Sequence, residues 1–230
     1  MTTVQEIITD EYDAVGGPPN SRLEEDGFQA GPTDVGEYVI AYCGRHSSDR
    51  YPNWSRIPWG ARLKEERNGK LYVFYEGRWT LLNAITPVTR QQIVEYHYSL
   101  YGKSTVPSTW VFNDFGHMTC YYFKNVNKNH KRDKNEKIHG EFIHTTPLDE
   151  ARSEQKRHLI LTESHGCVHV KPVDIDDMIK KEYLKRGNLL VVHQYREKLP
   201  THLYRGKGRA PFEVHFYPGK KKIIIKGLKR

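Results

Sequence analysis

The sequence predicts a mainly β protein, a β-rich α+β fold with a few helices. Most of its periodic segments are short, rich in β-branched and aromatic residues, and bounded by Gly, Pro, Asn or Asp, which is typical of strands and turns. Two segments have apolar residues at helical spacing. With 230 residues, 37% of them hydrophobic and 28% charged, the chain is long and apolar enough for one substantial core.

The predicted strands share alternating or β-branched residues between turn signals. They include a hairpin around Glu76-Gly77 and a second hairpin around Pro218-Gly219. The strand-forming segments lie at 37–42, 69–82, 108–124, 142–143, 158–161, 188–195 and 212–226. Because strands outnumber helices and do not alternate regularly with them, the pattern favours a β-rich architecture over a parallel α/β sheet.

The first predicted helix lies in "TPVTRQQIVEYHYSLYG", which begins with a Thr-Pro start signal and ends at Gly102. Ile93, Leu100 and either Tyr96 or His97 share one face at helical spacing. The second, "KPVDIDDMIKKEYLKRG", has acidic residues near its start, basic residues in its last turn and a glycine at its end.

Two polar intervals predict loops. Residues 124–137 carry six Lys or Arg and almost nothing apolar, so we expect a solvated excursion that could also cover a neighbouring site. Residues 148–157 are polar and also predict a loop.

Charge is distributed unevenly along the chain, whose formal net charge is +8. Residues 1–30 hold seven acids against one Arg, whereas residues 196–230 hold eleven Lys or Arg against two Glu. Such a basic segment can be a solvated edge or can bind nucleic acid, an acidic membrane or an anionic polymer, and charge alone does not choose among them. The segment "MTTVQEIITDEYD" is acidic where a signal peptide would be basic and then apolar, and no apolar run has the length of a membrane span.

The chain has three cysteines, Cys43, Cys120 and Cys167, so at most one disulfide can form within it. If a pair forms, Cys43 with Cys120 is the pair to test. Cys167 would then remain as the free thiol.

The stretch "LTESHGCVHV" combines the groups that a cysteine nucleophile needs. A thiolate requires a nearby histidine, and an oxyanion requires backbone N–H donors, which Gly166 and Cys167 can supply. His165 and His169 are the local candidates for the base, but neighbours one or two positions away on an extended chain usually point elsewhere. His144, at the end of the predicted strand in "FIHTT", is sterically easier.

A metal centre is the competing interpretation of this stretch. A zinc site from Cys167, His165, His169 and His144 is chemically permissible. The sequence has neither paired-Cys spacing nor a helical His-x-x-x-His pair there, so we expect no metal and no cofactor in this protein.

Three segments together resemble the L,D-transpeptidases of the YkuD type. These are "GPTDVGEYVI", "GEFIHTTP" and "SHGCVHVKP", which occur in the family's order over residues 31–172. The resemblance implies a YkuD-like β-sandwich or partly open barrel. It also implies three regions, namely a polar extension over 1–30, a catalytic domain over 31–195, and a basic hairpin over 196–230 packed on that domain.

The resemblance assigns roles residue by residue. Cys167 matches the nucleophile and His144 the histidine that activates it, with His139 as the second choice for the base. The residues matched to donor or orienting positions are Thr145, Ser164, His165 and Gly166. His169 stands where the family usually has Asn or Arg, so we expect it, with His139, to contact substrate. The spacing of 23 positions from His144 to Cys167 implies an insertion between them.

The implied reaction is acyl transfer on peptidoglycan stem peptides, through a thioester on the cysteine and with loss of a terminal D-alanine. The resemblance also implies inhibition by carbapenems and a place in the periplasm or cell wall. L,D-carboxypeptidase or D-amino-acid exchange activity, as in an antibacterial effector with a secretion or immunity partner, is an alternative. A non-catalytic wall-binding module is another. We expect a monomer that binds no nucleic acid.

Overall fold

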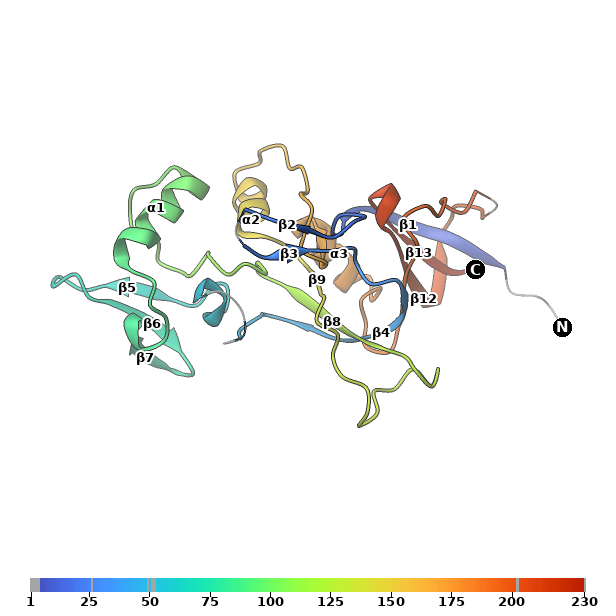
Figure 1. Ribbon diagram of the computed structural model, residues 1–230, viewed down its shortest axis with the longest axis horizontal. Helices are drawn as coiled ribbons and strands as arrows, with labels where there is room; N and C mark the ends of the chain where they lie inside the picture. The colour runs from blue at the N-terminus through green and yellow to red at the C-terminus, as the bar shows by residue number, and fades with distance from the viewer. Residues whose placement is uncertain (1–4, 26, 49, 51–52, 202, 230) are drawn as a thin grey trace. The chain divides into compact units, whose positions relative to one another are not determined.

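The computed structural model describes residues 5–25, 27–48, 50, 53–201 and 203–229. It contains a closed barrel of eight strands, a two-stranded sheet, a three-stranded sheet and three α-helices among these residues (Figure 1). The mainly β class predicted from the sequence is therefore confirmed. The chain divides into two compact units, one over residues 1–43, 120–144 and 161–230 and the other over residues 44–119 and 145–160.

The barrel runs in the order β1-β10-β9-β8-β4-β11-β12-β13. Its strands are β1 (Glu6–Val15), β4 (Gly36–Gly44), β8 (Thr119–Lys124), β9 (Ile143–His144), β10 (Val168–Val170), β11 (Leu189–Val192), β12 (Gly208–Tyr217) and β13 (Lys222–Lys229). β13 pairs antiparallel with both β12 and β1, and this closes the barrel (Figure 1). β9 and β10 run parallel to each other, as do β11 and β12.

The barrel is stable because its strands bury runs of apolar and β-branched side chains. Ile223, Ile224 and Ile225 of β13 are all buried, as the sequence "KKKIIIK" suggests for a strand enclosed by packing. The hairpin predicted around Pro218-Gly219 is confirmed, since β12 and β13 flank a short turn there.

A disulfide joins Cys43 in β4 to Cys120 in β8. The two strands are neighbours in the barrel, so the bond links adjacent positions that are 77 residues apart in the chain. The predicted pairing is confirmed, and Cys167 is the free cysteine.

The second unit has its own core. It contains β5 (Leu63–Glu65), β6 (Leu71–Tyr75), β7 (Arg78–Leu81), α1 (Arg90–Tyr101) and α2 (Pro147–Glu154). The sheet order is β5-β6-β7, and the hairpin predicted at Glu76-Gly77 is confirmed, with both residues at positive φ. Trp110 and Phe112 are fully buried, and the Trp110 indole N–H donates to the Trp54 carbonyl at 2.9 Å.

The two predicted helices are confirmed with different ends. Thr89 and Gln92 form a capping box at the start of α1, and Gly102 ends it in the left-handed conformation. His97, not Tyr96, joins Ile93 and Leu100 on the buried face. α3 (Pro172–Lys180) stops well before Gly187, because a turn follows Lys181.

Three local predictions were wrong. The interval predicted as a loop contains α2, whose N-cap is Thr146, with Asp149 N–H donating to its hydroxyl and Pro147 in the first turn. Residues 158–161 form no strand, and of residues 108–124 only β8 is regular strand. Trp110 and Phe112 are buried by tertiary packing although neither belongs to a β-strand. Strand propensity alone does not distinguish these two situations.

The remaining strands, β2 (Arg22–Leu23) and β3 (Gln29–Ala30), form the small two-stranded sheet. Among the residues that the structure describes, no helix has the length and apolar character needed to cross a membrane. The predicted boundaries 1–30, 31–195 and 196–230 stay a prediction.

Candidate active site

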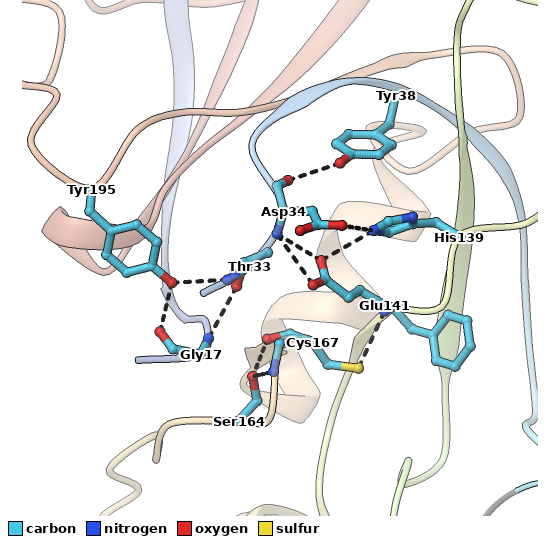
Figure 2. Close-up of polar contacts among 11 residues, drawn as sticks. Gly17, Thr33, Asp34, Tyr38, His139, Glu141, Ser164, Cys167 and Tyr195 are labelled. Carbon is cyan, nitrogen blue, oxygen red and sulfur yellow. Dashed lines mark hydrogen bonds and ion pairs between the residues drawn. The ribbon is translucent and has the colours of Figure 1, made fainter. Parts of the chain in front are cut away.

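Cys167 lies immediately before β10, which pairs in parallel with β9. The register aligns Val168 with Ile143 and His169 with His144. The Phe142 N–H donates to the Cys167 sulfur at 3.4 Å (Figure 2). The thiol and the end of the predicted histidine strand therefore lie on adjacent strands of one sheet.

The loop that leads into Cys167 is held by its own polar groups (Figure 2). The Ser164 hydroxyl donates to the Cys167 carbonyl and accepts from the Gly166 N–H at 3.0 Å. On either side, Ser164 N–H donates to the Gly16 carbonyl and Gly31 N–H donates to the His165 carbonyl. Ser164 thus contacts the backbone on both sides of the Gly166–Cys167 step, and its role as an orienting residue stays a prediction.

Gly166 occupies a position that other residues fit poorly. Its φ of +146° is rarely adopted by residues with a side chain, and an added Cβ would lie 2.9 Å from Glu141 Oε1. Gly17 approaches from the other side, where an added Cβ would lie 3.1 Å from the Gly166 nitrogen and closer still to the Gly31 carbonyl. The positive φ and the Glu141 side chain therefore account for the glycine before Cys167, and the close backbone approach accounts for Gly17.

A cavity of about 310 Å³ adjoins this loop. It is lined by Val15, Gly16, Gly17, Pro19, Glu163, Tyr195, Pro218, Gly219 and Lys221. Tyr195 fixes one wall, because its hydroxyl donates to the Gly17 carbonyl at 2.7 Å and accepts from the Thr33 N–H at 3.1 Å (Figure 2). The cavity has the size and mixed polarity of a small-molecule or peptide-end pocket.

Burial raises the pKa of the Cys167 thiol to about 12, and the nearby Glu141 carboxylate adds to the rise. The hydrogen bond from the Phe142 N–H opposes it. At neutral pH the resting sulfur is therefore a thiol, and a base has to take its proton as it attacks.

His169 is a neutral imidazole. Burial lowers its pKa to about 4, and the neighbouring His165 adds to the decrease, while the bond with Thr162 opposes it. Its Nδ1 lies 2.9 Å from the Thr162 carbonyl, so Nδ1 carries the proton and Nε2 does not. The His144 and His169 rings meet edge to face, with centroids 4.8 Å apart, and both side chains are buried.

His165 is more exposed than the other residues of the motif, and its ring contacts Phe28 with centroids 6.0 Å apart. Its backbone carbonyl accepts from the Gly31 N–H and so helps to shape the loop.

Thr145 follows His144 in the chain and belongs to the second unit. Its hydroxyl donates to Glu150 Oε1. The same oxygen accepts from the backbone N–H of His117 at 3.0 Å and lies 2.5 Å from the ring nitrogen Nδ1 of His117. Thr145 and Glu150 are both buried. Sequence reasoning missed Glu150 and His117, because Glu150 lies in the unpredicted α2 and neither residue is part of a recognised motif.

His139 lies with two carboxylates that sequence reasoning did not single out. Its Nε2 is 3.4 Å from Asp34 Oδ2 and 3.4 Å from Glu141 Oε2 (Figure 2). Asp34 lies within "GPTDVGEYVI" and Glu141 within "GEFIHTTP", so the two segments whose order suggested the family also contain this group.

Comparison with known families decides the assignment. The model of the L,D-transpeptidase catalytic domain, YkuD, matches residues 6–192. The chain belongs to the L,D-transpeptidase family. No curated protein and no solved structure gave a match.

The L,D-transpeptidase match covers six of the eight barrel strands, from β1 through β11, and leaves out β12 and β13. Every candidate site residue named from the sequence lies within the match. The predicted resemblance is therefore confirmed.

Proposed function

We propose that this L,D-transpeptidase domain acylates Cys167 with a peptidoglycan stem peptide and passes the acyl group to an amine. The observation that carries the proposal is the parallel pairing of β9 with β10, which brings the one free cysteine and the strand of His144 together. The His144 ring packs against His169 of β10, two residues after Cys167.

The pKa of Cys167 determines how the first step has to run. Since the resting thiol is protonated, the His144 imidazole takes its proton as the sulfur attacks the carbonyl of the third stem residue. The Cys167 N–H stabilises the resulting oxyanion, since the Ser164 and Gly166 N–H groups already donate to the Gly16 carbonyl and the Ser164 hydroxyl. The bond to the terminal D-alanine then breaks, and His144 returns its proton to the leaving amine.

The second step regenerates the thiol. An acceptor amine attacks the thioester carbonyl and loses a proton to His144, and the carbon–sulfur bond breaks. The sulfur recovers that proton. The new peptide bond is the cross-link, and the atoms balance without a metal or cofactor.

His144 is the better candidate for the base than His139. His139 Nε2 lies 3.4 Å from a carboxylate oxygen of Asp34 and 3.4 Å from one of Glu141, so this nitrogen faces those two side chains. His144 lies on the strand paired with the one after Cys167. We assign His169 to positioning the His144 ring, and Ser164, Gly166, His165 and Thr145 to the local structure around the two reactive groups.

A wall location is supported by the disulfide as well as by the family. Disulfides persist in oxidising compartments such as the periplasm and the cell exterior, where peptidoglycan is assembled. The family also supports the peptidoglycan substrate.

The test is incubation of the protein with purified tetrapeptide muropeptides, followed by mass spectrometry of the products. We expect cross-linked dimers and released D-alanine with the unmodified protein and neither with Cys167→Ala. Tripeptides without dimers would replace the transpeptidase assignment with a carboxypeptidase, and termini exchanged for an added D-amino acid would indicate an exchange enzyme. Turnover that survives in Cys167→Ala would contradict the proposal for all three reactions.

A further inference from the structure

His139 is held in a fixed orientation in the first unit. Its ring lies between Tyr38 and Tyr122, with centroid distances of 5.0 Å and 5.5 Å. Tyr122 is fully buried, and the Tyr38 hydroxyl donates to the Asp34 carbonyl at 3.0 Å. The direction in which the imidazole presents Nε2 is therefore set by packing.

That nitrogen is buried and has no hydrogen-bond partner among the described residues. It lies 3.4 Å from one oxygen of Asp34 and 3.4 Å from one oxygen of Glu141, yet neither contact has hydrogen-bond geometry. A buried imidazole nitrogen left without a partner is unfavourable unless something else binds it. The group formed by His139, Asp34 and Glu141 therefore lacks a partner for His139 Nε2.

The spacing of these atoms fits a tetrahedral metal ion. Zinc binds His nitrogen and carboxylate oxygen at about 2.0–2.2 Å, so two ligands at a tetrahedral angle lie roughly 3.3–3.6 Å apart. The measured nitrogen–oxygen distances of 3.4 Å fall in that interval, and the three ligand atoms all lie within 4.8 Å of one another.

The Glu141 carboxylate is also oriented as metal ligands usually are. Both of its oxygens accept from the Asp34 N–H, at 3.2 Å and 3.1 Å, and retain lone pairs for a cation (Figure 2). The Asp34 side chain is 66% exposed, so an ion can enter from solvent.

We propose that His139 Nε2, Asp34 and Glu141 bind a zinc-type divalent cation with an open fourth position, beside the loop that carries Cys167. The site adjoins that loop because an added Cβ on Gly166 would touch Glu141.

The test is zinc titration of the tag-free, metal-stripped protein by calorimetry, together with Co²⁺ as a spectroscopic probe. We expect one zinc per chain and the intense visible bands of tetrahedral cobalt. Glu141→Gln and Asp34→Asn should each weaken binding by at least about tenfold, since loss of even an outer partner of a metal ligand typically has an effect of about 10–100-fold. Asp34→Asn changes an exposed side chain and should leave folding intact. Weaker zinc binding by this variant therefore reports on the site and not on loss of the fold.

Two controls isolate the site. Glu163→Gln removes a different carboxylate, one paired with Arg22, and should leave zinc affinity unchanged. Cys167→Ala should also bind zinc with unchanged affinity, although it cannot form an acyl-enzyme, so the site can be tested whatever becomes of the proposed reaction. Absence of stoichiometric zinc, equal affinity in Glu141→Gln, or loss of binding in Cys167→Ala would each overturn the three-ligand site.

Discussion

The protonation state of Cys167 has a direct chemical consequence. Only the thiolate reacts with iodoacetamide, so a thiol whose pKa is raised to about 12 should be alkylated slowly at pH 7. We expect the alkylation rate to rise about tenfold per pH unit from pH 7 to pH 10, without a plateau. In denaturant the same cysteine should reach its plateau near its ordinary pKa of about 8.5. A plateau below pH 8 in the folded protein would show a preformed thiolate.

A second prediction at this scale concerns Gly166. Gly166→Ala forces a Cβ to within 2.9 Å of Glu141 Oε1 at a φ of +146°, so we expect the free energy of unfolding to fall by about 1–3 kcal/mol and acylation of Cys167 to slow. Gly140→Ala is the matched control, because an added Cβ there meets nothing within 4 Å, and it should leave both quantities unchanged. Urea denaturation provides the measurement. Equal effects of the two substitutions would contradict the role given to Gly166.

Candidate site residues could be proposed from the sequence where a local motif contains them. Cys167, Ser164 and Gly166 form such a motif, and His144 followed from a matching segment upstream. Asp34 and Glu141 could not be found in this way, because their proximity to His139 depends on how β4 and the chain before β9 come together. Their sequence neighbours contain no ligand spacing that indicates a cluster.

At the scale of elements, α2 shows the effect of a cap on a polar segment. Residues 148–157 contain few apolar residues, so periodicity predicts a loop, yet Thr146 and Pro147 start a helix there. α1 and the two hairpins were predictable because capping, turn and periodicity signals all agree in those segments.

The helix α2 supplies Glu150, which accepts from both Thr145 and His117. Glu150→Ala removes this shared acceptor from buried donors, so we expect a loss of about 2–3 kcal/mol in the free energy of unfolding, measured by urea denaturation. Glu154→Ala, an exposed change on the same helix, should stay within about 0.5 kcal/mol. Similar losses from both variants would show that helix propensity, not the shared acceptor, determines the effect.

For the whole molecule, the disulfide joins two barrel strands across 77 residues of chain. The chain-entropy argument gives at most about 4–5 kcal/mol for a loop of this length, and measured values are usually about 2–4 kcal/mol. Replacing both Cys43 and Cys120 with Ala should therefore lower the free energy of unfolding by about 2–4 kcal/mol. Cys167→Ala, which leaves the bond intact, should not reproduce this loss, and an equal loss would show that the disulfide contributes little.

The β-rich class was predictable from the sequence because it depends on many segments at once. Closure of the barrel was not, since β13 pairs with β1 across nearly the whole chain and neither strand contains a signal for its partner. The same holds for β9 with β10, whose pairing supports the proposed reaction. Long-range register comes from packing, and a single sequence shows packing only through a family resemblance.

The central claim is that Cys167 is a nucleophile activated by His144. It is tested most directly by the intact mass of the protein after exposure to a carbapenem, a β-lactam that should acylate the same sulfur. The account predicts one adduct per chain in the unmodified protein and in His139→Ala, no adduct in Cys167→Ala, and acylation slowed by at least about 100-fold in His144→Ala. An adduct that persists in Cys167→Ala, or loss of acylation in His139→Ala but not in His144→Ala, would contradict it.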